Sequence, residues 1–194
     1  MLRSAAALGL ALGLLVVAAC GGSATIPQQR LSHLVLRERD LGRPFSAFNS
    51  GPQTQLDNQG TPRADGARFG REGGWIARYR RPGSPATEGP LLVESRADLF
   101  SSAGGAKKDL EAYRATLAAV PGVQRRPLAL PQIGDAALGV TFEQPGAVPL
   151  RFFRIAWRYR NATASVTVEG FGRKVRLADA LVLVRRQQQL IAQP

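Results

Sequence analysis

The sequence predicts an α+β fold, with a single antiparallel sheet of about five to six strands and two amphipathic helices packed on one face. Short stretches of alternating apolar and polar residues follow one another with turns of Gly, Pro and Asn between them, which is typical of antiparallel strands. Two longer stretches have apolar residues three and four apart, as amphipathic helices do. The 194 residues are 44% hydrophobic and 21% charged, a globular composition.

Six segments are predicted strands. The clearest covers residues 151–159, where Phe153, Ile155, Trp157 and Tyr159 share one face and would point to the core. A tight hairpin at Arg160-Asn161 then leads into the next strand, since Asn tolerates a positive φ. The other predicted strands cover residues 31–36, 75–80, 91–95, 136–143 and 162–168.

Two helices are predicted, over about 98–119 and 175–192, and Gly104-Gly105 weakens the middle of the first. Residues 42–74 hold seven Gly and three Pro without sustained periodicity. They predict a long surface loop, which Phe45 and Phe48 would pin to the core. The helices and strands together form one domain over residues 31–194.

The N-terminus predicts export. Arg3 precedes a run from Ala5 to Ala19 that has no polar side chain, which is typical of a secretory signal and too short for a spanning helix. Val17, Ala18, Ala19 and Cys20 resemble the bacterial lipobox. The resemblance implies cleavage after Ala19 and attachment of a diacylglyceryl group to Cys20, the first mature residue. Residues 1–19 would then be the signal peptide and residues 20–30 a flexible tether.

A plain signal peptide or an uncleaved anchor, with Cys20 incidental, is the alternative. If cleavage occurs, Arg3 is the only charged residue lost, so the net charge of +12 becomes +11. The lipid anchor predicts a protein held on the outer face of the cell membrane, or on its periplasmic side if there are two membranes.

Short motifs resemble those of small bacterial envelope lipoproteins of the PsbP-like type. They are Asp40-Leu41-Gly42, the strand ending at Ser95, Ile133-Gly134-Asp135-Ala136, and Phe153-Arg154 with Asn161 at the following hairpin. The group often has Pro after Asp-Leu and Gly before the hairpin Asn, whereas this chain has Gly42 and Arg160. The resemblance spans about residues 31–192 and implies the fold and the location, without an activity.

The sequence contains few of the residue types and motifs that enzymatic catalysis uses. One Cys and one His exclude an intramolecular disulfide and a four-ligand zinc site of the Cys/His type. The sequence has no P-loop, dinucleotide fingerprint, Gly-x-Ser-x-Gly or His-Glu-x-x-His. We therefore expect no enzyme, no cofactor and no metal site, and we interpret His33 as a surface or edge residue. Asp135 could form half of an acid pair with Glu143 or Glu169, but an Asp that shapes a turn is the favoured interpretation.

Arginines alternate with aromatic or apolar residues on two of the predicted strands. If those strands are neighbours, the guanidinium groups form a stripe that suits phosphate or carboxylate. The stripe would consist of Arg78, Arg80, Arg154, Arg158 and Arg160. Export makes nucleic acid an unsuitable partner and favours anionic lipid head groups or anionic wall polymers. A solvated outer face without a partner is the favoured alternative.

These features predict a membrane-anchored envelope lipoprotein whose domain binds, senses or assists without catalysis, together with an unknown envelope protein. The first alternative is a small-molecule or lipid carrier with an apolar pocket between sheet and helices, lined by Trp75, Phe153, Trp157 and Tyr159. The second is a secreted hydrolase that uses carboxylates, which requires two acids to converge in a cleft.

Overall fold

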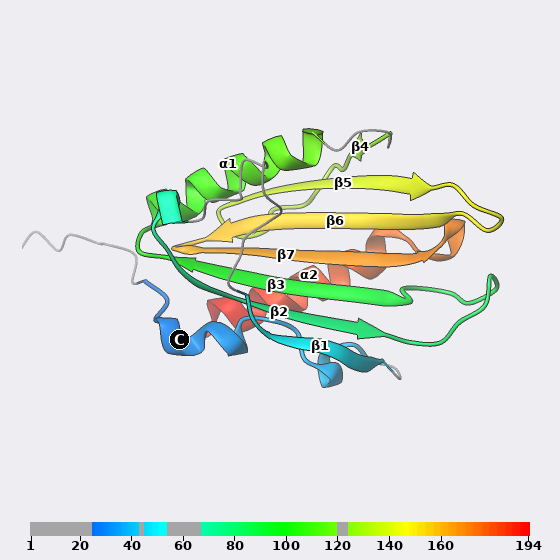
Figure 1. Cartoon of the computed structure of the whole chain (residues 1–194), viewed down its shortest axis with the longest axis horizontal. Helices are drawn as coiled ribbons and strands as arrows, with labels where there is room; N and C mark the ends of the chain where they lie inside the picture. Colours follow the sequence, from blue (N-terminus) through cyan, green and yellow to red (C-terminus); the bar gives the residue numbers. More distant parts are fainter. Residues whose placement is uncertain (1–24, 43–44, 54–66, 120–123) are drawn as a thin grey trace, which may run out of the picture.

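The computed structural model describes residues 25–42, 45–53, 67–119 and 124–194. Within them, seven strands form one antiparallel sheet in the order β1-β2-β3-β7-β6-β5-β4 (Figure 1). The strands are β1 (Ser46–Pro52), β2 (Arg71–Arg80), β3 (Leu92–Phe100), β4 (Arg126–Pro127), β5 (Ala136–Gln144), β6 (Leu150–Tyr159) and β7 (Ala162–Phe171). The α-helices are α1 (Ala103–Ala119) and α2 (Leu177–Ala192), and the 3₁₀ helices are η1 (Gln28–His33), η2 (Glu38–Asp40), η3 (Ala67–Phe69) and η4 (Gly172–Lys174). The predicted α+β class is confirmed, and the sheet is larger than the predicted five to six strands.

The prediction that both helices pack on one face is wrong. Successive residues of a strand point to opposite faces, so Thr163 and Ala164 of β7 do so as well. The Thr163 hydroxyl donates to Asp109 of α1 at 2.6 Å. Ala164 pairs with Trp157, whose ring N–H donates to Gln188 of α2 at 2.6 Å. The helices therefore cover opposite faces, and in Figure 1 α2 lies behind the sheet. We call the α1 side the front face and the α2 side the back face.

The main core lies between the back face and α2. The predicted inward residues Phe153, Ile155 and Trp157 are all buried there, and Val166 of β7 lies fully buried among them. Trp157 buries its whole side chain, and Val184 of α2 belongs to the same cluster. The phase that the alternation predicted for β6 and β7 is thus confirmed.

The front face is covered in part by α1. Leu110, Tyr113 and Leu117 pack against Ala156 in a smaller cluster. The helix begins at Ala103 rather than near residue 98, because β3 continues to Phe100. A Cβ at Gly105 would lie 2.2 Å from the Phe69 carbonyl oxygen, so this glycine lets η3 approach the helix closely.

Two N-terminal predictions need correction. The segment 31–36, predicted as a strand, holds the end of η1 and then the buried Leu34, Val35 and Leu36. Three consecutive buried residues do not show the alternating burial of a half-buried strand. The apolar run alone therefore did not distinguish a strand from an irregular buried segment. The predicted loop at 42–74 contains the edge strand β1 and the start of β2. Residues of β1 are almost all exposed, and an edge strand tolerates Gly and Pro, so the sequence lacked a strand pattern there.

The two phenylalanines predicted to hold that loop against the core differ in burial, and one residue of the predicted tether belongs to the core. Phe45 is buried as predicted, whereas Phe48 is exposed. Ile26, inside the predicted tether 20–30, is 2% exposed and belongs to the main core. The folded part of the chain therefore begins before residue 31. Residues 1–24, which include Cys20, lie outside the described residues.

The hairpin at Arg160-Asn161 is confirmed, with Tyr159 paired to Ala162. Arg160, not Asn161, has the positive φ, at 53°. A positive φ at the first of two loop residues is the pattern of a type II′ turn. Asn161 is buried instead, and its side chain binds backbone groups far away in sequence.

Candidate functional site

The predicted arginine stripe is interrupted in the structure. Arg78 and Arg154 lie in one row across the front face, but β3 and β7 separate their strands and place Glu94 and Thr167 between them. The condition under which the stripe was predicted, that the two strands be neighbours, is therefore not met.

Four of the five predicted arginines have nearby partners. Arg78 donates to Glu94 at 2.7 Å, and a terminal nitrogen of Arg158 lies 3.0 Å from Asp135. The remaining two stack over rings, Arg80 at 5.6 Å from the centroid of Phe48 and Arg160 at 5.1 Å from that of Tyr159. Arg154 differs: its Nε is buried and has no acceptor among the described residues.

A second arginine lies beside Arg154. Arg125 comes directly before β4, and its Nε and Nη1 are also buried without an acceptor in the described part of the chain. Burial lowers the pKa of Arg125, and the positive charge of Arg154 lowers that pKa further. Two guanidinium groups that repel each other, with buried N–H groups left unsatisfied, form a site that an anion would complete.

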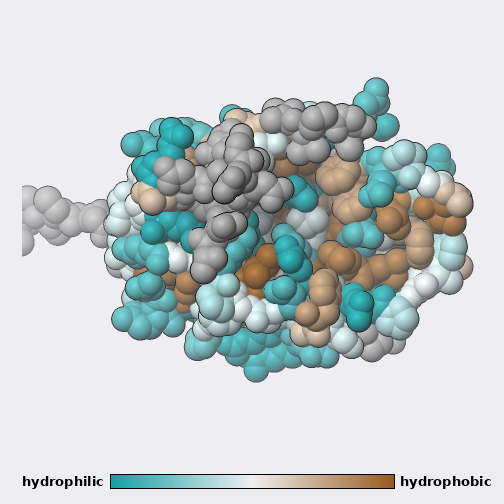
Figure 2. Space-filling view, viewed as in Figure 1, coloured by the Kyte–Doolittle hydropathy of each residue, from teal (hydrophilic) through white to brown (hydrophobic). Residues whose placement is uncertain are grey.

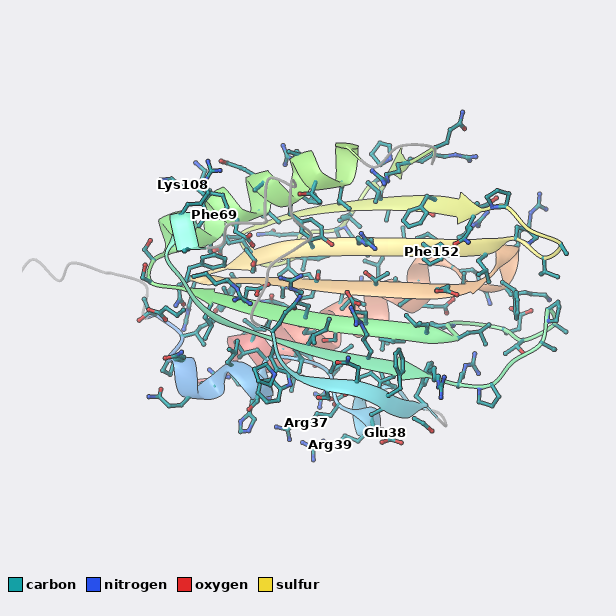
Figure 3. The ribbon with its side chains drawn as sticks, in the orientation of Figure 1. Arg37, Glu38, Arg39, Phe69, Lys108 and Phe152 are labelled. Atoms are coloured by element: carbon teal, nitrogen blue, oxygen red, sulfur yellow. The ribbon has the colours of Figure 1, made fainter. Side chains whose placement is uncertain are left out.

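Strand pairing and aromatic packing hold this arginine pair in place. Val140 of β5 pairs with Arg154 on one side and with Pro127 of β4 on the other. The Arg125 guanidinium lies 5.9 Å from the ring centroid of Phe142. Phe142 in turn stacks on Phe152, with centroids 4.7 Å apart. Phe152 is labelled in Figure 3 on β6, toward the start of that strand.

An open groove of about 600 Å³ adjoins the pair, between the C-terminal half of α1 and β5. Its apolar lining includes Leu117, Leu138 and Val140. Arg114 and Arg125 line it as well, and Arg114 is exposed. Figure 2 shows brown, apolar surface interspersed with teal on the half of the front face beside the end of α1. The groove therefore combines an apolar floor with cationic side chains.

Two carboxylates of the front face, those of Glu94 on β3 and Glu169 on β7, lie on the two strands that come directly before β6 in the sheet order. Glu94 already pairs with Arg78. Glu169 lies on β7 opposite Phe152, and burial raises its pKa. Among the described contacts, neither carboxylate bonds to Arg125 or Arg154, so the positive charge of the pair is not neutralised there.

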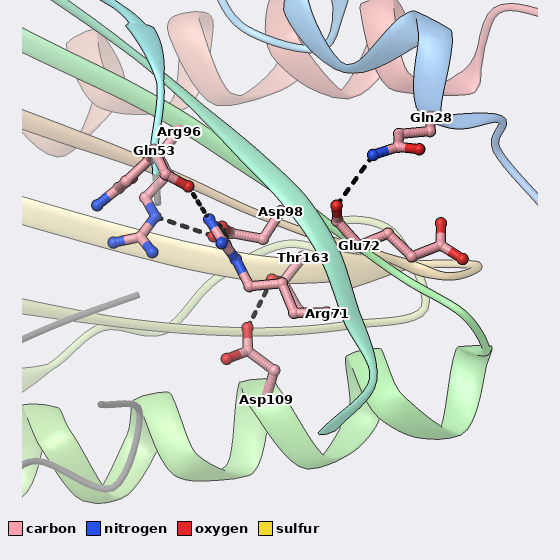
Figure 4. A network of polar contacts seen from close by, with 8 residues as sticks. All are labelled: Gln28, Gln53, Arg71, Glu72, Arg96, Asp98, Asp109 and Thr163. Carbon is pink, nitrogen blue, oxygen red and sulfur yellow. Dashed lines mark hydrogen bonds and ion pairs between the residues drawn. The ribbon is translucent and has the colours of Figure 1, made fainter. Parts of the chain in front are cut away.

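A buried ionic network lies on the same face, near β1 (Figure 4). Asp98 accepts from Arg71 Nη2 at 2.7 Å and from Arg96 Nε at 2.9 Å. Arg71 also donates to the Gln53 carbonyl at 2.6 Å. Asp98 is thus held by two cations, and its role is to neutralise them. Nη2 of Arg96 and Oε1 of Gln53 have no partner among the described residues.

The predicted acid pairs do not converge. Asp135 precedes β5 and Glu143 lies near its end, so eight residues of extended strand place them about 26 Å apart. Asp135 is engaged instead with Arg158 and with the backbone N–H of Arg160 at 2.9 Å. Glu169 lies opposite Phe152, six residues along β6 from the Arg158 that Asp135 binds. His33 is exposed, and no three His, Cys, Asp or Glu side chains gather in the described ranges.

The predicted carrier pocket is also not formed where it was expected. Phe153 and Trp157 are buried in the core against α2, so they fill the space in which the pocket was predicted. The groove beside α1 lies elsewhere and has other lining residues. Arg96 and Arg125 were missed: Arg125 precedes a two-residue strand that has no pattern, and Arg96 lies on a strand whose predicted range ended at Ser95.

No family model matches the chain, and no curated protein matches it. The structure is similar to the extracellular domain of PknH from Mycobacterium tuberculosis, with a TM-score of 0.64. The two share a fold. Sequence identity to the PknH domain is 14%, and the alignment covers 88% of this chain and 98% of that domain. At this identity the PknH domain defines the architecture and leaves the ligand open. No helix in the described residues is long and apolar enough to cross a membrane.

Proposed function

We propose that this chain is a lipid-anchored envelope protein whose folded domain binds a ligand on its front face, as a sensing or accessory module without catalysis. The observation that carries the binding role is the Arg125–Arg154 pair. Its buried N–H groups lack acceptors among the described residues, and Arg125 lines an open groove. Membership of the PsbP-like group and attachment through Cys20 are parts of the same proposal.

The position of Ile26 supports the anchored arrangement. Ile26 is fixed to Asn161 at the β6–β7 turn, and it lies six positions after Cys20 in the sequence. Such a segment spans at most about 22 Å, so a lipidated Cys20 would hold that end of the domain near the bilayer. Lys108 lies at the same end of the molecule (Figure 3), and Arg160 belongs to the turn itself. These cationic side chains would be attracted to an anionic membrane surface.

The location of the similar PknH domain supports the proposal. The PknH domain is an extracellular domain, and we propose that this domain of similar architecture also faces the outside of a membrane. The groove beside α1 gives this domain a surface that could bind the ligand of a sensing or accessory module.

The anchor is tested by expressing the full chain and its Cys20→Ala variant in a bacterial host and fractionating the cells. We expect the native chain to remain with membranes after a carbonate wash and to incorporate labelled palmitate, and the variant to lose the label. Ser23→Ala is the matched control and should behave as the native chain. Equal labelling of the Cys20→Ala variant would refute the anchor.

A further inference from the structure

We propose that the groove beside α1 binds an amphiphile with one alkyl chain and a phosphate or carboxylate head group, the head lying between Arg125 and Arg154 and the chain along β5. This inference deepens the proposed function, since it names the ligand class of the front-face site. It uses the same surface and does not depend on how the protein is held at the membrane.

The head-group half rests on unsatisfied donors. Three buried N–H positions, Arg125 Nε, Arg125 Nη1 and Arg154 Nε, have no acceptor in the described part of the chain. Burying a charged donor without an acceptor is costly, and a planar guanidinium matches a phosphate or carboxylate through parallel hydrogen bonds. A neutral ligand would leave both positive charges uncompensated, so the charge of the site selects an anion.

The alkyl half rests on the lining of the groove. Leu117, Leu138 and Val140 border about 600 Å³ of open space, and Val140 is the direct strand partner of Arg154. An anion held at Arg154 is therefore one strand away from this apolar wall. Inorganic phosphate would leave the wall in water, whereas an alkyl chain would cover it. At the groove, Arg114 adds a third cation on the solvent side.

The test uses photocrosslinking, because it reports where a ligand binds. The full chain is placed in zwitterionic phosphatidylcholine nanodiscs and exposed to dodecyl phosphate that carries a diazirine at the end of its alkyl chain. We expect the label on peptides of α1 and β5, and we expect unlabelled dodecyl phosphate to compete for it. The uncharged dodecanol diazirine should label these peptides at least about tenfold less, since charge-assisted hydrogen bonds are lost.

Two variants separate binding from folding. Arg154→Gln should lower labelling at least about tenfold, whereas Arg39→Gln, at an exposed arginine on the opposite edge (Figure 3), should leave it unchanged. Val140→Glu places a carboxylate opposite Arg154 and should abolish labelling in a protein that melts no earlier than the native chain. Val140→Gln is its matched control for the lost apolar contact: it should lower labelling less than Val140→Glu does, because it brings no negative charge to Arg154.

Each outcome has a defined meaning. Equal labelling by the phosphate and the alcohol refutes the anionic head group. Competition by inorganic phosphate as strong as by dodecyl phosphate refutes the alkyl half. If labelling fails while the Cys20→Ala variant still leaves the membrane, the ligand class is wrong and the anchored module stands. If labelling succeeds while Cys20→Ala stays attached, the anchor is wrong and the ligand site stands.

Discussion

The side chain of Asn161 binds both backbone groups of Ile26, from a position 135 residues away in sequence. Its Oδ1 accepts from the Ile26 N–H at 2.7 Å, and its Nδ2 donates to the Ile26 carbonyl at 3.2 Å. Nδ2 also donates to the Phe100 carbonyl at 2.8 Å. One amide in a hairpin turn thus joins the N-terminal segment to the ends of β3 and β7.

Asn161→Ala should destabilise the protein by about 3 kcal/mol, because it leaves buried backbone groups of Ile26 and Phe100 unsatisfied. The free energy of unfolding in urea measures the loss. Asn49→Ala, at an exposed residue of β1, is the control and should change it by less than about 0.5 kcal/mol. Equal effects at the two positions would show that the link from Asn161 to Ile26 contributes nothing.

Asp98→Asn should cost about 3–5 kcal/mol, because it leaves the buried Arg71 and Arg96 without their full counter-charge. The Arg78–Glu94 pair is also an ion pair of the front face, but its side chains are 38% and 26% exposed. Glu94→Gln should therefore cost less than about 1 kcal/mol. Thermal melting of the two variants side by side measures the contrast, and similar melting temperatures would contradict it.

Gln187 is a fully buried polar residue of α2 that bridges the helix to β3. It accepts from the Ser95 hydroxyl at 2.8 Å and donates to the Arg96 carbonyl at 2.9 Å, while the Leu36 N–H donates to the same hydroxyl at 2.9 Å. Gln187→Met should lower the free energy of unfolding by about 1–3 kcal/mol. Gln189→Met, on the exposed side of the same helix, should leave it nearly unchanged. A Gln187→Met protein as stable as the native chain would show that the bridge is dispensable.

Glu169 should make the stability of the protein depend on pH. Burial raises its pKa in the folded state above the ordinary value of 4.5, so ionisation of its carboxyl opposes folding. The stability due to the neutral carboxyl is complete below the unfolded pKa and is lost as pH rises through the folded pKa. Glu169→Gln should therefore gain stability relative to the native chain at pH 7 and little at pH 4. Urea unfolding at both pH values tests this, and an equal difference at both would contradict it.

The elements with strong periodicity could be predicted from the sequence, and those without it could not. The alternation around Phe153 and Trp157 identified β6 and its buried side, and the three-four spacing located most of α1 and α2. The edge strand β1 and the two-residue β4 have no core-facing side to produce a pattern, so both were missed. Without β4, the position of Arg125 beside the sheet could not be expected.

Hydrophobic patterning is a local property of the chain, and it was enough to specify the α+β class and the phase of the central strands. The export signal at residues 1–19 stays a prediction. Which face each helix covers depends on how the chain crosses the sheet, because both faces of β7 are largely buried. The placement of β3 and β7 between the arginine-bearing strands is set in the same way, by long-range pairing. That pairing separated the predicted stripe and brought Arg154 close to Arg125, which lies 29 positions away in sequence and lines the groove.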